Sequence, residues 1–114
     1  MTAITDPAKG FTGRWRILTL GRWGKDYLDL IEEAHLTFRG AAGGNIAFGT
    51  LEGSLEVTYV AFEQSVRAVF SWKGEDGADD VSGSGWAMPG TDGRLVGHFH
   101  IEGGDVCTFV CERD

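Results

Sequence analysis

Short runs in which hydrophobic and polar residues alternate recur along the chain, separated by glycine, aspartate and asparagine. Alternation with a period of two is typical of strands that bury one face. In the first run, Trp15, Ile17 and Thr19 are predicted to face inward, and Leu18 and Leu20 outward. The runs predict eight strands: Arg14–Leu20, Ala34–Arg39, Asn45–Leu51, Ser54–Phe62, Ser65–Lys73, Ser82–Met88, Arg94–Ile101 and Val106–Arg113.

One segment has helical spacing instead. Between Asp26 and Ala34, apolar residues recur at i, i+3, i+4 and i+7, with Asp26 as a possible N-cap. We therefore predict a short helix over Asp26–Ala34 whose apolar stripe (Tyr27, Leu30, Ile31 and Ala34) covers one open end of the sheet.

Eight short strands joined by tight turns, with one helix after the first strand, favour an all-β fold. A meander of this many antiparallel strands removes its exposed edges by closing on itself. We predict a single domain over residues 13–114, an eight-stranded antiparallel up-and-down barrel, preceded by a flexible N-terminal segment at 1–12. The strands are broken in this prediction by loops at Gly40–Gly44, at Gly53 and at Gly74–Asp80.

The ends of this barrel carry a familiar pattern. Gly13-Arg14-Trp15 opens the first strand and Arg113 ends the last. This resembles the calycins (lipocalins, fatty-acid-binding proteins and avidins), in which a G-x-W motif lies on the first strand and a late arginine packs across the tryptophan face. The resemblance implies that the first and last strands are neighbours. An eight-stranded barrel encloses either packed side chains or one small ligand, and the resemblance does not carry over a particular ligand. The segment after Trp15, RILTLGRWG, lacks the polar set that binds biotin in avidins.

A second resemblance covers most of the chain, from about Gly13 to Arg113. The sequence is similar to a set of small uncharacterised bacterial proteins. This resemblance implies a shared fold and a bacterial origin, but it implies no activity. The matching stretches are Gly13–Ile17, Tyr27–Leu30, Phe48-Gly49 with Gly53, Phe70–Gly74 and Ser82–Ala87.

Charge narrows the possible partners. Seventeen acidic against ten basic residues give a formal net charge of −7, which argues against binding nucleic acid or an anionic membrane. The N-terminus lacks the apolar core of a signal peptide, so we expect a cytoplasmic protein. Cys107 and Cys111 lie four residues apart on one strand, at roughly 13 Å, which is too far for a disulfide and fits a reducing compartment.

No catalytic motif and no cofactor-binding motif is present, so no catalytic residue and no cofactor is predicted. His98 and His100 form an H-x-H that could aim two imidazoles at one metal, with His35 as a possible third ligand. Since both alternate with apolar residues, we expect them to face solvent. The acidic loop 74–80 (GEDGADD) lacks the calcium-loop spacing and is expected to be a solvated connector or a contact for a basic partner.

The chain has four tryptophans, and their expected positions in the barrel are the basis of the functional hypothesis. Trp15, Trp72 and Trp86 are expected as walls of the lumen, while Trp23 and Tyr27 flank its mouth. We expect non-catalytic binding of a small apolar or aromatic ligand in the lumen or at the mouth. The ligand-binding candidates are Trp15, Trp23, Tyr27, Trp72, Trp86 and Arg113.

The alternative is a protein-interaction or homo-oligomerising module with a barrel filled by side chains. Its basis is a set of apolar residues predicted to face outward: Leu18, Leu20, Val60, Phe62, Val69 and Val96. The binding hypothesis predicts a cavity with a few inward polar groups, and a void-free lumen filled by Phe38, Phe48, Phe70 and Phe99 would contradict it.

Overall fold

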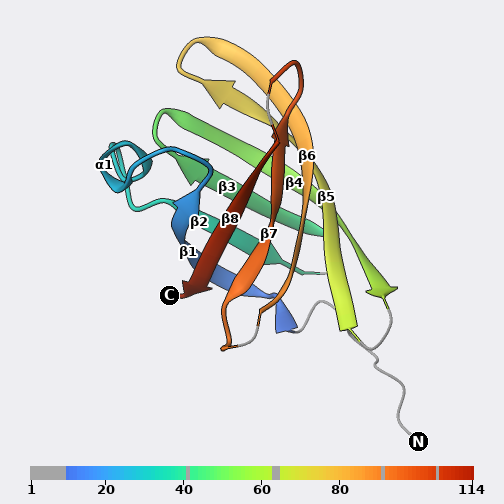
Figure 1. The fold of residues 1–114 in the computed structure, drawn as a ribbon. Helices are drawn as coiled ribbons and strands as arrows, with labels where there is room; N and C mark the ends of the chain where they lie inside the picture. Colours follow the sequence, from blue (N-terminus) through green and yellow to red (C-terminus); the bar gives the residue numbers. More distant parts are fainter. Residues whose placement is uncertain (1–9, 41, 63–64, 91, 105) are drawn as a thin grey trace, which may run out of the picture.

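The computed structural model describes residues 10–40, 42–62, 65–90, 92–104 and 106–114. It is an all-β, closed barrel in which every strand pairs antiparallel with its neighbour in sequence, and the last strand with the first (Figure 1). The strands are β1 (Gly13–Leu20), β2 (His35–Arg39), β3 (Gly43–Phe48), β4 (Leu51–Phe62), β5 (Ser65–Asp76), β6 (Asp79–Pro89), β7 (Leu95–Ile101) and β8 (Val106–Arg113). The predicted fold class is therefore confirmed.

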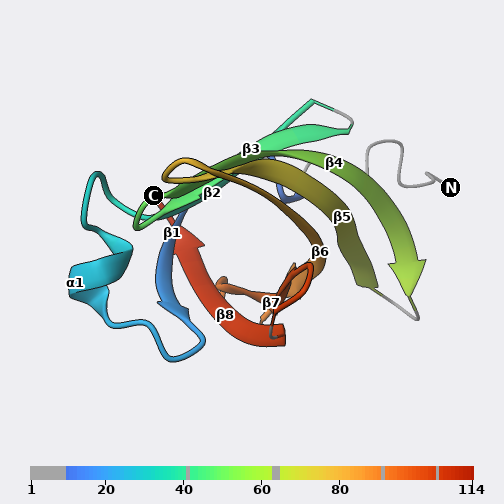
Figure 2. The same cartoon turned by 90° about the horizontal axis from the view of Figure 1, so that it is seen from above.

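The helix is shorter than predicted. α1 spans only Lys25–Leu28 and lies outside the ring of strands, beside β1 (Figure 2). Leu28 is buried, whereas Leu30 and Ile31 are 59% and 69% exposed. The predicted helix ends early because the Asp29 carboxylate accepts a hydrogen bond from the Ala34 backbone N–H at 2.9 Å. That contact closes the segment into a loop, so the predicted stripe does not form.

Two of the predicted breaks between strands, at Gly53 and at Gly74–Asp80, are wrong because the strands run further than the alternation suggested. β4 passes through Gly53, and the turn between β3 and β4 lies at Gly49, where φ is +55°. The acidic segment is mostly strand, since Glu75 pairs with Asp80 across the β5–β6 hairpin. Charged side chains do not prevent a strand at a hairpin end, where both faces meet water.

A β-bulge in β1 reverses the predicted alternation after Ile17. Ile17 pairs with Cys111 and Thr19 with Val110, so Leu18 is the extra residue of β1. The bulge turns Leu20 into the core, where it is 1% exposed, and leaves Thr19 exposed. The predictions that Thr19 faces inward and Leu20 outward are therefore wrong.

The N-terminal segment enters the barrel before β1 begins. Residues 1–9 of the predicted flexible segment lie outside the described residues. Phe11 is 2% exposed, and its ring lies against Phe38 and Tyr59 at centroid distances of 5.7 and 5.3 Å. Phe11 thus packs against the lumen residues at the end of the barrel where β1 starts.

Candidate functional site

Aromatic side chains fill the lumen. The lumen residues Phe38, Phe48, Phe70 and Phe99 are each no more than 3% exposed. Trp15 and Trp72 face inward beside them, as predicted. The Trp72 and Phe99 rings stack at 4.9 Å, and Phe48 meets Phe99 edge-on at 5.6 Å. The protein's own side chains thus occupy the space that a lumen ligand would need.

Glycines on β6 make room for these rings. A Cβ built at Gly83 would lie 2.8 Å from Trp72 Nε1, and one at Gly85 would lie 2.6 Å from Phe70 Cζ. Real Cβ atoms do not approach so closely, so the rings of β5 occupy the space that side chains on β6 would take.

Because Gly83, Gly85 and Ala87 take the inward positions of β6, Trp86 lies on the outer face. The prediction that Trp86 forms a wall of the lumen is therefore wrong. Its ring stacks on His98 at 4.7 Å, and the Arg67 guanidinium lies 4.2 Å from its centroid. Trp86 is part of an outer-surface stack that joins β5, β6 and β7.

Trp15 and Arg113 connect the two ends of the chain. Arg113 lies opposite Trp15 in the β1–β8 pairing, with its guanidinium carbon 4.1 Å from the indole centroid. It also donates hydrogen bonds to the carbonyls of Thr12 (2.6 Å) and Gly10 (3.0 Å). Arg113 hydrogen-bonds to backbone carbonyls and stacks on the buried Trp15. We therefore interpret the pair as one that joins the first strand to the last and closes the barrel.

Trp23 lies at the mouth, which we define as the end of the barrel where β3 turns into β4 and β7 turns into β8. Its backbone N–H bonds to the Leu20 carbonyl at 3.2 Å, which folds the segment after β1 into a tight turn. One side of the indole packs on Tyr27 and Phe48, at 5.9 and 5.1 Å between centroids. The ring remains 38% exposed, so it closes the lumen below and presents aromatic surface to solvent.

Tyr27 supports this arrangement from the side. Its ring packs against Gly49 so closely that a Cβ there would lie 2.3 Å from the ring. Its hydroxyl is 3.4 Å from Thr50 Oγ1. Tyr27 therefore positions Trp23 and flanks the mouth, as the sequence predicted.

A pocket of about 790 Å³ opens between the turn after β1 and the β7–β8 hairpin. Arg22 is the one charged residue among those that line it, and Val106 is 61% exposed. Sequence reasoning missed Arg22, although an arginine in the glycine-flanked GRWG turn of an acidic chain is a usable signal. The residues that line this mouth pocket are Gly21, Arg22, Trp23, Ile101, Val106, Cys107 and Thr108.

The two cysteines do not form a disulfide in the structure, and they differ in access. Cys107 is partly exposed and lines the mouth pocket, with its Sγ 3.6 Å from the Phe99 carbonyl oxygen. Cys111 is fully buried, and burial raises the pKa of its thiol well above the usual range. Cys107 is therefore the thiol that reagents in solution reach first.

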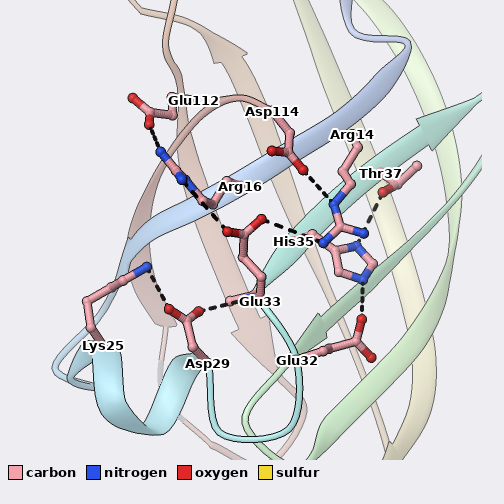
Figure 3. Close-up of polar contacts among 11 residues, drawn as sticks. Arg14, Arg16, Lys25, Asp29, Glu32, Glu33, His35, Thr37, Glu112 and Asp114 are labelled. Carbon is pink, nitrogen blue, oxygen red and sulfur yellow. Dashed lines mark hydrogen bonds and ion pairs between the residues drawn. The ribbon is translucent and has the colours of Figure 1, made fainter.

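His98 and His100 lie on the outer face of β7, as the alternation predicts. Among the residues that the structure describes, no group of three or more His, Cys, Asp or Glu side chains is arranged to hold a metal ion. His35 is on the outer face of β2 and is only 7% exposed. Its Nε2 lies 3.1 Å from Glu32 Oε1 and its Nδ1 3.3 Å from Thr37 Oγ1, so both ring nitrogens have polar neighbours (Figure 3).

Ion pairs cover the outside of β1 and the segment before β2 (Figure 3). Arg16 contacts both Glu112 and Glu33, and the Glu112 carboxylate, as hydrogen-bond acceptor and negative charge, raises the pKa of the Arg16 guanidinium. Arg14 Nε lies 2.8 Å from Asp114 Oδ2. These pairs link β8, β1 and the segment before β2.

Comparisons with protein-family models, curated proteins and solved structures gave no match to this chain. Within the described part of the chain, no helix is long and apolar enough to cross a membrane. The site is therefore interpreted from its own geometry.

Proposed function

We propose that this protein binds a small, mostly apolar or aromatic ligand without catalysis, in the mouth pocket. The observation that carries the proposal is Trp23, whose indole is held by Phe48 and Tyr27 yet keeps 38% of its surface exposed beside a pocket of about 790 Å³. A preformed apolar pocket with few polar groups is the usual setting of a small-molecule site.

The filled lumen leaves no room for the expected ligand inside the barrel, so the proposal retains only binding at the mouth. Trp23 contacts Phe48, Phe48 contacts Phe99, and Phe99 stacks on Trp72, so aromatic rings run without interruption from the mouth into the lumen. A ligand that enters the mouth would meet the exposed face of Trp23 and go no deeper. Of the candidates from the sequence, Trp23 and Tyr27 would serve the site, while Trp15, Trp72 and Arg113 would support the barrel.

Cys107 provides a direct test, because it lines the pocket whereas Cys111 is buried and serves as an internal control. With 2-naphthamide as probe, we expect alkylation of Cys107 by iodoacetamide to slow in proportion to occupancy, while Cys111 stays unreactive. Both thiols lie in one tryptic peptide, residues 95–113, so fragment-ion mass spectrometry of that peptide measures the two rates separately.

Two variants assign the protection to the pocket. Trp23→Ala should weaken the protection by about tenfold in probe concentration, the effect of losing one aromatic contact. Trp86→Ala removes a tryptophan from the outer face and should leave the protection unchanged. If the probe fails to protect Cys107 at about 1 mM, or protects it equally in Trp23→Ala, the proposal is wrong.

The same proposal places the protein among calycin-like carriers in a reducing compartment such as the cytoplasm. Support comes from the Arg113–Trp15 contact across the β1–β8 seam and from the two cysteines, which are not joined in a disulfide.

A second candidate function is self-association through the outer face of β4 and β5. Val60 and Val69 are 43% and 41% exposed, and they lie on neighbouring strands because Val60 pairs with Arg67 and Thr58 with Val69. The side chain of Phe62, also expected on this face, lies outside the described residues. A second copy of this acidic chain would bring carboxylates toward Arg67. A dimer mass by light scattering that reverts to monomer in Val69→Asp supports this candidate, and a monomer for both proteins rejects it.

A further inference from the structure

We infer that the mouth pocket selects organic anions, namely flat apolar molecules that carry a carboxylate or sulfonate group. This inference rests on the proposed function and specifies its ligand class. It starts from the charge of the pocket, which is opposite to that of the whole chain.

Arg22 sets that charge. Among the described residues that line the pocket, Arg22 is the one ionisable residue besides Cys107, and none of them is acidic. Within the described residues, Arg22 has no carboxylate at salt-bridge distance, whereas Arg14 and Arg16 each have two. Its guanidinium is therefore available to pair with a ligand.

Two other grooves on the surface are lined by more carboxylates than cations. The groove over β3, β4 and β5 is lined by Glu32, Glu52 and Glu75 with a single lysine. The groove over β4 to β7 carries Glu56 and Glu102 with Lys73. In a protein with a net charge of −7, an anion is repelled at these two acidic grooves and attracted toward Arg22 at the mouth pocket.

The backbone holds Arg22 next to the apolar wall. Gly21 adopts φ +56° and its N–H bonds to the Thr108 carbonyl at 2.8 Å, which ties the turn to β8. A Cβ at position 21 would lie 2.8 Å from Cys107 Cβ, so the turn lies directly against the pocket floor. A ligand ring on Trp23 and an anionic group toward Arg22 would thus use two adjacent residues of one fixed turn.

The test compares 2-naphthoate with 2-naphthamide, which have the same ring system and differ in charge. Protection of Cys107 from iodoacetamide gives the affinity for each. We expect 2-naphthoate to bind about fivefold more tightly at low salt, the effect of one partly exposed ion pair. The preference should fall below about twofold in 0.5 M NaCl because salt screens the pair.

Arg22→Ala should abolish the preference while 2-naphthamide still binds with unchanged affinity. Arg39→Ala is the matched control, because Arg39 is an exposed arginine at the other end of the barrel with no ion pair among the described residues. It should retain the preference. If both probes bind equally, or if Arg39→Ala loses as much preference as Arg22→Ala, the anion inference is wrong and the mouth site stands. If neither probe protects Cys107, both proposals are wrong.

Discussion

Gly85 decides, at the scale of one residue, how tightly the lumen is filled. A Cβ at this position would lie 2.6 Å from Phe70 Cζ and 2.6 Å from the His98 carbonyl oxygen. Gly85→Ala should therefore lower the free energy of unfolding by about 2 kcal/mol, since overpacking a core forces rings or backbone to move. Urea unfolding followed by tryptophan fluorescence measures the change.

Gly43→Ala is the matched control for that experiment. Gly43 is also a strand glycine, but a Cβ there would lie 3.6 Å from the Arg39 carbonyl oxygen, an ordinary contact. Its unfolding free energy should stay within about 0.5 kcal/mol of the parent. Equal stability for both variants would mean that the lumen has spare room beside Phe70.

Asp29 gives the protein a small pH dependence. The hydrogen bond from the Ala34 N–H, followed by the interactions with Lys25, lowers the pKa of the Asp29 carboxyl. A carboxyl with a lowered folded pKa adds stability above its unfolded pKa of about 3.9 and loses it as the pH falls through the folded value.

Asp29→Asn should thus cost at most about 1 kcal/mol at pH 7, because the group is partly exposed. The difference from the parent should shrink as the pH falls below about 4. Urea titrations at pH 7 and pH 3 measure it, and a difference that grows toward pH 3 would contradict this account of Asp29.

At the scale of elements, the sequence predicted the strands well where one face is buried by large side chains. The alternation in β7 correctly placed Leu95 and Phe99 inward and His98 and His100 outward. It failed in β6, where the inward positions 83, 85 and 87 are two glycines and an alanine. Hydrophobicity favours Trp86 as the buried residue, but the glycines leave the space that the aromatic rings of β5 occupy. That relation joins residues on different strands, so no local pattern contains it.

The predictions for α1 and β1 failed for related reasons. The helical spacing over Asp26–Ala34 is real, but the hydrogen bond between Asp29 and Ala34 favours a loop. The bulge at Leu18 depends on pairing with β8, more than 80 residues later in the sequence. Of the candidate site, Trp23 and Tyr27 at the mouth were predictable from their place in the loop, and Arg22 had a local signal in the GRWG turn. Cys107 needed the fold, which brings β8 against the turn after β1.

The β1–β8 seam makes a prediction at this scale. Arg113→Ala removes the contact with the Trp15 ring and two hydrogen bonds to the Gly10 and Thr12 carbonyls. We expect a loss of about 1–2 kcal/mol in the free energy of unfolding. Exchange of the Trp15 indole proton, which bonds to the Phe11 carbonyl at 2.8 Å, should also accelerate.

Arg39→Ala serves again as the control, since its side chain is exposed on the β2–β3 hairpin. Both its stability and its Trp15 exchange should match the parent. Unchanged exchange in Arg113→Ala would show that Arg113 does not hold the seam.

At the scale of the whole molecule, the interior of the barrel is occupied by side chains, and the pocket at the mouth is lined by apolar residues and Arg22. Exposed aromatic surface on a packed scaffold suits binding with little reorganisation of the protein. Stability therefore resides in the lumen, whereas the recognition that we propose would use the turn after β1 and the β7–β8 hairpin.

The four tryptophan indoles report on these places separately. Trp23 lies at the mouth, Trp15 and Trp72 in the lumen, and Trp86 on the outer face. The Trp72 indole N–H bonds to the His100 carbonyl at 3.1 Å, so its resonance is sensitive to any change in the lumen.

The most direct measurement is a titration with 2-naphthamide followed in ¹H–¹⁵N spectra of the four indole N–H groups. The account predicts a concentration-dependent shift of the Trp23 resonance, with Trp15, Trp72 and Trp86 unchanged or nearly so. Shifts at Trp15 and Trp72 with Trp23 unchanged would place the ligand in the lumen and contradict the account.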